Sequence, residues 1–347
     1  MALAVDVDQL TSVGLAAGLD AVGIAAAEPF AGTRAVLEAR KEAGLHGGMA
    51  FTYRNPARST DPHAALPGAQ AIVVGARAYD PARSTAPSVP AGRVAAYARR
   101  NEYEPLRAAL RAVADLLVGA GWRARVLADD NALVDREAAY RAGIGWYGKS
   151  SNLLLPGRGS WFVLGSVLTT APLPTAPAPV ADGCGACRRC LDACPTGAIV
   201  APGVVDARRC LAWLLQQAGT FPVEQRASLG DRIYGCDDCQ DVCPPNRRPP
   251  AGVPAEPWVP LVELLEANDD DLLARHGWWY IPERDPRWLR RNALVALGNV
   301  AAADDPTARA VLHRYRSDDD VVLAEHAAWA LHRLDERGAV VPRGGLA

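Results

Sequence analysis

The chain has 347 residues, half of them apolar, and a formal net charge of −2 at pH 7. This length indicates two or three domains with a sizeable core, and the charge gives no bulk signal for nucleic-acid binding. No run of 18 apolar residues occurs, so we expect no membrane span. Residues 1–19 lack a basic start and are interrupted by Asp6 and Asp8, which predicts an amphipathic helix rather than a signal peptide.

Residues 1–172 alternate strand and helix patterns. Short apolar runs with glycine in or beside them predict buried strands at 21–24 and 71–75, and residues 161–168 predict another. Residues 104–117 predict a helix whose apolar positions lie on one side, namely Leu106, Leu110, Val113 and Leu117. We therefore expect an α/β domain over residues 1–172.

All eight cysteines follow a linker rich in proline and alanine at 172–179, and they lie within residues 184–243. Cys184 opens a C-x2-C-x2-C-x3-C-P run, and Cys236 opens a C-x2-C-x3-C-P run. The first run has the spacing of bacterial ferredoxins, in which the cysteine before proline binds the other cluster. We therefore predict a ferredoxin-like module with two [4Fe-4S] clusters over residues 173–250.

This spacing assigns four thiolates to each cluster. The first set is Cys184, Cys187, Cys190 and Cys243, and the second is Cys194, Cys210, Cys236 and Cys239. Disulfides and structural zinc are the alternatives. Eight thiols so closely spaced are poorly suited to disulfides, and zinc sites usually lack the third cysteine and the proline that follows the last one.

Residues 251–347 predict helices with a partial repeat. The segments 292–297 and 326–331 have matching apolar positions and stand 34 residues apart, a period that suits paired-helix repeats of the HEAT type. Two unrelated amphipathic helices are the alternative. A repeat array would offer a concave surface to a large partner.

Other cofactor and partner signals are weak. No dinucleotide loop, P-loop or H-E-x-x-H pair occurs, and Asp61-Pro62-His63 starts a cobalt-binding D-x-H pattern whose glycine is replaced by Leu66. Arginine pairs that could contact phosphate are also typical of solvated surfaces, and they are Arg188-Arg189, Arg208-Arg209, Arg247-Arg248 and Arg290-Arg291.

Several motifs together resemble the epoxyqueuosine reductase family. They are Asp129, Asp135-Arg136, the stretch 141–146, Gly148-Lys149, 159–162, 190–198 and 234–240. The resemblance implies an oxidoreductase that removes the epoxide oxygen from epoxyqueuosine at the wobble position of tRNA, giving queuosine. It also implies cobalamin without a histidine on cobalt, in a domain similar to that of reductive dehalogenases. The resemblance further implies that the clusters reduce the cobalt, that the reduced cobalt opens the epoxide, and that a carboxylic acid then protonates the alkoxide.

The resemblance assigns the proton donor to Asp129, which also counts among the cofactor contacts. Asp130 is an alternative acid, and a loop or capping aspartate is the plain structural interpretation of Asp129. The implied cobalamin contacts are Arg58, Ala95, Leu153, Leu164 and Ala212. Without the resemblance, the four apolar members would be read as core residues. Lys149 is one of only two lysines. A role in the site is no more plausible from the sequence than a role at a helix end or on the surface.

The chain departs from the family pattern at Glu102 and Glu104, which could alter the substrate because an added carboxylate repels a phosphate-bearing partner. Two other functions therefore stay open: a cobalamin-dependent reductase of another epoxide or an organohalide, and an iron–sulfur electron carrier without catalytic cobalamin. The expected partners are tRNA and a low-potential electron donor. We expect a cytoplasmic monomer.

Overall fold

The computed structural model describes residues 3–82, 84–176, 178–249 and 252–340. The chain forms two units, each built from separate stretches of sequence. The first unit contains Met1–Pro81, Arg100–Arg208 and Asp238–Pro254. The second contains Ala82–Arg99, Arg209–Asp237 and Ala255–Ala347. The three domains expected from the sequence stay a prediction, and their boundary at 250/251 lies outside the described residues.

A four-stranded sheet organises the first unit. Its strand order is β1 (Ala21–Ala26), β2 (Ala71–Ala78), β7 (Phe162–Thr169) and β4 (Ala124–Leu127), and every neighbouring pair is antiparallel. The strands predicted at 21–24, 71–75 and 161–168 are β1, β2 and β7. An α/β composition is therefore confirmed for this unit, with an antiparallel sheet.

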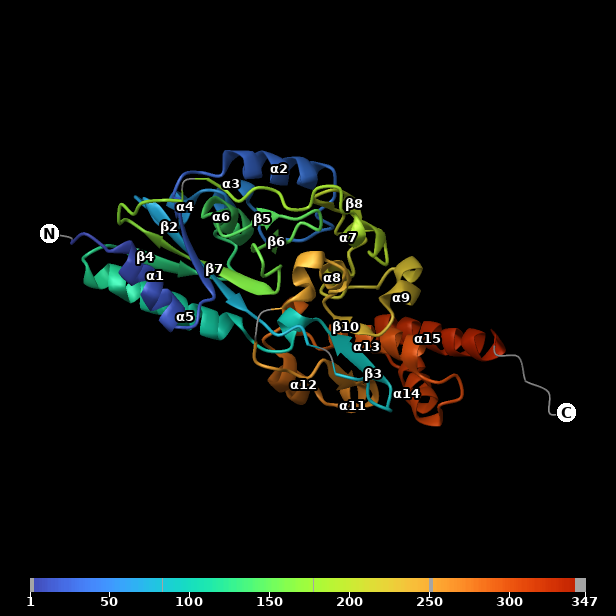
Figure 1. Ribbon diagram of the computed structural model, residues 1–347. Helices are drawn as coiled ribbons and strands as arrows, with labels where there is room; N and C mark the ends of the chain where they lie inside the picture. Colours follow the sequence, from blue (N-terminus) through green and yellow to red (C-terminus); the bar gives the residue numbers. More distant parts are fainter. Residues whose placement is uncertain (1–2, 83, 177, 250–251, 341–347) are drawn as a thin grey trace. The chain divides into compact units, whose positions relative to one another are not determined.

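Helices cover both faces of this sheet (Figure 1). The helix predicted at 104–117 is α5 (Tyr103–Gly119), and its four predicted core side chains are fully buried. A Cβ on Gly75 would lie 3.1 Å, and one on Gly165 2.7 Å, from a methyl group of Leu110. Glycine in the strands thus lets α5 approach closely. The helix α1 (Val7–Ala16) packs beside α5, within the predicted stretch 1–19, of which residues 1–2 lie outside the described residues.

The opposite face of the sheet packs against α6 (Asp135–Arg141). Ile72, Val74 and Ala76 alternate along β2 and share a core with Ala138 and Ala139 of α6. This alternation follows from the two-residue period of a strand. The remaining elements of the unit are α2 (Ala31–Glu42), α3 (Pro56–Ser59), α4 (Pro62–Ala65), β5 (Trp146–Tyr147), β6 (Leu153–Leu154), α7 (Arg189–Asp192), β8 (Ile199–Ala201), β9 (Val204–Val205), α10 (Asp238–Asp241) and η2 (Pro244–Arg247).

The second unit combines a small sheet with helices. The strand order is β10 (Arg232–Tyr234), β3 (Ala91–Val94) and β11 (Trp258–Pro260), where β10 pairs parallel and β11 antiparallel to β3. Its helices before the tail are η1 (Ala96–Ala98), α8 (Leu211–Leu214), α9 (Val223–Leu229), α11 (Leu261–Glu266), α12 (Asp269–His276) and η3 (Pro282–Arg284).

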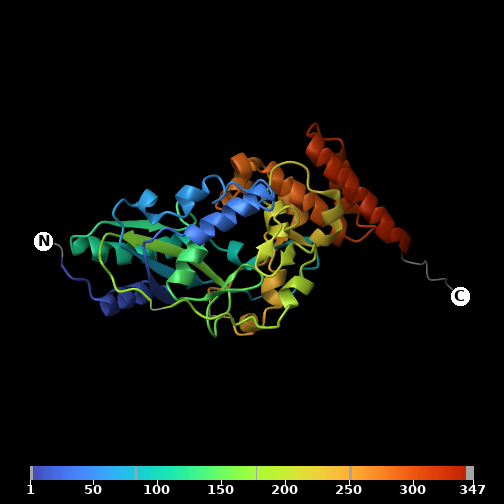
Figure 2. The same ribbon diagram turned by 90° about the horizontal axis from the view of Figure 1, so that it is seen from above.

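The tail of the second unit is helical, as expected. It consists of α13 (Arg287–Val300), α14 (Pro306–Arg316) and α15 (Val321–Val340), and Figure 2 shows the last of these, in red, running to the end of the described chain. The two similar segments lie in α13 and α15, which pack together so closely that a Cβ on Gly298 would lie 2.7 Å from the Cα of Ala330. The HEAT-type repeat stays a prediction. No helix within the described residues is long and apolar enough to cross a membrane.

Candidate functional site

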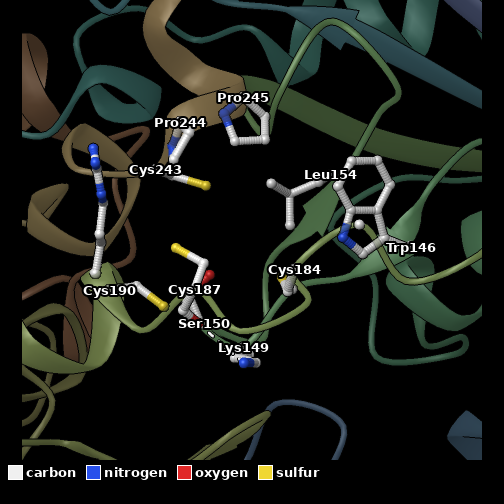
Figure 3. A pocket seen from close by; sticks show the side chains of 13 residues that line it. Trp146, Lys149, Ser150, Leu154, Cys184, Cys187, Cys190, Cys243, Pro244 and Pro245 are labelled. Carbon is white, nitrogen blue, oxygen red and sulfur yellow. Dashed lines mark hydrogen bonds between the residues drawn. The ribbon is translucent and has the colours of Figure 1, made fainter.

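Four of the eight cysteines border one pocket of the first unit (Figure 3). Cys184 and Cys187 lie in the loop before α7, Cys190 lies within α7, and Cys243 directly precedes η2. Burial and the neighbouring charges of Cys184, Cys190 and Cys187 raise the pKa of the Cys243 thiol to about 11. The thiols are therefore close enough to interact, and they are the four predicted to hold the first cluster.

The pocket fits a compact inorganic cluster. Its volume is about 90 Å³, well below the roughly 300 Å³ at which pockets for organic ligands begin. None of the eight cysteines, all of them described, forms a disulfide. No group of three His, Cys, Asp or Glu side chains in the described ranges converges as a single metal ion requires. The four thiols instead line the pocket from different sides, as a four-iron cube with one thiolate per iron requires.

The second predicted cluster set is divided between the two units. Cys194 and Cys239 belong to the first unit, and Cys210 and Cys236 to the second. In the first unit, the backbone N–H of Ala198 points to the Cys194 sulfur at 3.2 Å. In the second, Cys236 follows β10 and Cys210 precedes α8. This ligand set stays a prediction.

Lys149 contacts the first cluster loop directly. Its Nζ donates hydrogen bonds to the carbonyl oxygens of Gly185 at 2.6 Å and Cys187 at 3.0 Å, and its side chain lines the same pocket. The general surface role considered from the sequence is therefore replaced by a specific contact with the ligand loop.

The predicted proton donor lies on the loop between β4 and α6. Asp129 has a φ of 54°, a left-handed conformation that non-glycine residues rarely adopt and that is over-represented at functional sites. This loop is tied to the helix that carries Arg58, because the N–H of Val134 donates to the Ser59 carbonyl at 3.0 Å. The N–H of Thr52 also donates to the Asn131 side chain at 3.0 Å. The structure thus joins the loops of two predicted site residues.

The electrostatics of the loop distinguish its two adjacent aspartates. Asp129 is exposed, yet nearby protein atoms displace part of the water around its carboxyl and raise its pKa, an effect that Arg107 opposes and the charge of Asp130 reinforces. Asp130 instead accepts a hydrogen bond from the N–H of Ala132 at 2.8 Å. Asp130 therefore stabilises the turn of this loop, which is the structural role that an aspartate commonly has in such a position.

Three neighbours of Asp129 were not predicted to belong to the site. Arg107 donates to the Ala128 carbonyl at 2.9 Å, and its guanidinium lies 5.8 Å from the Tyr103 ring centroid. Burial, followed by the charge of Asp129, raises the pKa of Asp135 well above its usual range. Tyr103 and Arg107 stand four residues apart, which places them on one side of α5. This spacing of four residues was the sequence signal from which the pair could have been predicted.

Comparisons with known proteins show which family this chain belongs to. A family model for a 4Fe-4S double cluster binding domain matches residues 183–246. An epoxyqueuosine reductase from Shewanella oneidensis is 35% identical over 346 residues, covering 93% of this chain and 87% of the relative. This chain belongs to the epoxyqueuosine reductase family.

Solved structures of epoxyqueuosine reductases agree with that membership. One from Bacillus subtilis, described with its catalytic aspartate loop swung out of the active site, has a TM-score of 0.85 at 30% identity and covers 94% of this chain and 90% of its own. Another, described with an epoxyqueuosine-modified tRNA-Tyr stem loop, has a TM-score of 0.84 at 30% identity and covers 94% and 89%. The likeness therefore extends over both units.

The two glutamates that depart from the epoxyqueuosine reductase pattern have different surroundings. Glu102 is buried and accepts hydrogen bonds from Arg77 and Arg100, each at 3.1 Å. Its charge is paired within the first unit, which gives it a structural role. Glu104 is exposed on the first turn of α5. The supposed cobalt pattern is also local structure, because the Asp61 carboxylate caps α4 by accepting from the His63 N–H.

The cobalamin contacts implied by the epoxyqueuosine reductase resemblance have varied environments. Arg58 is exposed on α3, Leu153 is buried on β6, and Leu164 is half-buried on β7. Ala95 is buried after β3 and Ala212 is half-buried on α8, both in the second unit. Their contact with a cofactor stays a prediction.

Proposed function

We propose that this chain reduces epoxyqueuosine to queuosine in tRNA. The observation that carries the proposal is Asp129, a carboxyl of raised pKa on an exposed loop, in the same unit as the four-cysteine pocket. Converting an epoxide to an alkene and water takes two electrons and two protons. An iron–sulfur module supplies the electrons, a carboxylic acid supplies one proton, and solvent supplies the other.

Electrons enter through the two clusters. We assign the first to Cys184, Cys187, Cys190 and Cys243 and the second to Cys194, Cys210, Cys236 and Cys239, with a low-potential donor outside the chain. The match to a double cluster binding domain over residues 183–246 supports this assignment. Four-iron centres reach the low potentials that such a reduction needs.

Cobalamin is the second proposed cofactor. Arg58 and Asp129 fit a bound corrinoid in one respect, since both are exposed and their loops are joined by the bond between Val134 and Ser59. Leu153, Leu164, Ala95 and Ala212 would add apolar contacts. When bound and reduced, the cofactor supplies the nucleophilic metal centre that opens the epoxide ring.

Asp129 supplies the proton in this proposal. Ring opening leaves an alkoxide, which is a strong base, and a neutral carboxyl beside it can transfer its proton in the same step. The raised pKa of Asp129 keeps a larger fraction of the group protonated near neutral pH than an ordinary aspartate would. Arg107 stabilises the carboxylate that remains, and solvent can then reprotonate it through the exposed loop.

The finer organisation also belongs to the proposal. We assign residues 1–172 to the cobalamin domain, 173–250 to the ferredoxin-like module and 251–347 to HEAT-like repeats. The packing of α13 on α15 supports the last of these. We further propose a cytoplasmic monomer that binds tRNA, because a relative has been solved with a tRNA stem loop and one chain carries every predicted ligand.

The test is anaerobic turnover. Reconstituted protein is mixed with cobalamin, a low-potential reductant and tRNA that carries epoxyqueuosine, and the nucleosides are read by mass spectrometry. We expect the modified nucleoside to lose about 16 mass units, one oxygen, and Asp129→Ala to abolish this loss. An unchanged nucleoside, despite intact clusters and bound cobalamin, would overturn the proposed substrate.

A further inference from the structure

Trp146 has a buried polar atom that no described residue satisfies. Its side chain is 8% exposed and lines the four-cysteine pocket, and its indole N–H meets no hydrogen-bond acceptor among the described residues. Burying a donor without a partner costs about 1 to 3 kcal/mol. Such a donor at the edge of a ligand pocket indicates a partner that occupies the pocket.

The orientation of Trp146 supports this interpretation. In Figure 3 the indole nitrogen lies on the side of the ring that faces the cysteines. A Cβ on Gly183 would lie 2.7 Å from the indole ring, so the ring packs against the main chain just before Cys184. The absence of a side chain at Gly183 therefore lets Trp146 approach the start of the ligand loop.

Lys149, three residues after Trp146, brings a positive charge to the same pocket. Its two hydrogen bonds to the Gly185 and Cys187 carbonyls hold the ammonium group against the ligand loop. Arg189 also lines the pocket, but it is exposed, so solvent screens its charge more strongly than that of the half-buried Lys149. The segment 146–149 thus presents an N–H donor and a fixed cation.

We propose that Trp146 and Lys149 tune the cluster bound by Cys184, Cys187, Cys190 and Cys243. Trp146 donates its indole N–H to a sulfur of the bound cluster, and Lys149 holds a positive charge beside it. Taking up one electron from the low-potential donor adds one negative charge to the cluster and its thiolates. Both groups stabilise that added charge, so together they raise the reduction potential of this cluster. The inference rests on the proposed cluster, and it is independent of the substrate.

The experiment is an EPR-monitored redox titration of the reconstituted full chain. Trp146→Phe keeps an aromatic ring and removes the N–H donor, and Lys149→Gln removes the positive charge. We expect each variant to lower one of the two cluster potentials, so that the ratio of reduced to oxidised cluster at a fixed potential falls about tenfold. For a one-electron couple, this tenfold change corresponds to a shift in reduction potential of about 59 mV. Lys149→Arg should restore most of the shift.

Matched controls separate tuning from general disturbance. Trp122→Phe removes an indole whose N–H donates to the Leu3 carbonyl, and Lys41→Gln removes the only other lysine, exposed on α2. Both controls should leave both potentials unchanged. Unaltered potentials in Trp146→Phe and Lys149→Gln, with full iron content, would overturn the inference.

A second measurement detects the proposed hydrogen bond directly. Pulsed EPR of the reduced protein, compared in H₂O and D₂O, should detect an exchangeable proton coupled to the first cluster. That coupling should disappear in Trp146→Phe, whereas its persistence would assign the proton to another donor and overturn the role of Trp146. Missing iron or a missing cluster signal in the unmodified protein would instead refute the cluster on which the inference rests.

Discussion

Burial raises the pKa of the Asp135 carboxyl group, and the negative charge of the nearby Asp129 raises it further. One oxygen of Asp135 is buried and has no partner among the described residues, and α6 begins at this residue. The start of α6 therefore places a second acidic group near the loop that carries Asp129. Asp129 is the proposed acid, and Asp135 is a neighbouring carboxyl whose pKa is also raised.

Replacing Asp129 with asparagine should reduce turnover by about 10²- to 10⁴-fold, because the proton donor is lost while the shape of the side chain is kept. The measurement is single-turnover conversion of epoxyqueuosine in tRNA. Asp130→Asn is the matched control, and it should have a much smaller effect because Asp130 accepts a turn hydrogen bond. Equal losses in the two variants would contradict the assignment of the acid.

The activity should decrease as pH rises through the raised pKa of Asp129, because only the protonated carboxyl donates. The control is Arg107→Gln. Removing the guanidinium that lowers this pKa should shift the descending limb to higher pH. The measurement is the pH dependence of the single-turnover rate at a constant reductant potential. A descending limb that does not move in Arg107→Gln would argue against Asp129 as its origin.

Asp135 should make the folded state less stable as pH rises. Its pKa is raised in the folded chain above the ordinary value of 3.8, so the folded state binds more protons than the unfolded state between these two values. The contribution of Asp135 to the free energy of unfolding is complete below pH 3.8, and it is lost as the pH rises toward the pKa in the folded state. Asp135→Asn should weaken this pH dependence, measured by denaturant unfolding from pH 5 upward. An unchanged slope would show that Asp135 does not titrate there.

Glu102→Ala should destabilise the first unit by about 3 kcal/mol, because it leaves the partly buried Arg77 without its charged partner. Glu104→Ala should change stability by less than about 0.5 kcal/mol, because Glu104 is exposed. Thermal unfolding of both variants is the measurement. A gain in turnover on epoxyqueuosine tRNA in Glu102→Ala would instead restore the view that this glutamate changes the substrate.

Arg291→Met should reduce iron binding at the second cluster. Arg291 is buried, and its guanidinium donates to the carbonyl oxygens of Gln217 at 2.6 Å and Gly219 at 2.7 Å, in the segment after Cys210 and α8. Methionine leaves those carbonyls unsatisfied, which loosens this segment. We expect the iron content to fall toward half. Arg290→Met, at a half-buried arginine, should retain full iron, and equal losses would contradict a specific role for Arg291.

The local pattern of the sequence was sufficient to predict the strands β1, β2 and β7, the helix α5 and the cysteines that meet in the first pocket. Apolar periodicity and the spacing within each cysteine run are short-range properties, so neighbouring residues determine them. The resemblance to epoxyqueuosine reductases also gives Asp129 as the candidate acid, a role that stays a prediction.

Only the tertiary structure revealed the environments that set the chemistry. Glu102 was interpreted as a substrate-altering carboxylate, and its pairing with Arg77 depends on a residue 25 positions away. The raised pKa of Asp129, the buried oxygen of Asp135 and the N–H of Trp146, which has no partner among the described residues, all depend on burial. Burial and charge pairing arise from segments that are distant in sequence, whereas motif spacing does not. The sequence by itself therefore determined the family and predicted the cluster ligands, and the packing of the chain decided which of the described groups are buried, paired or without a partner.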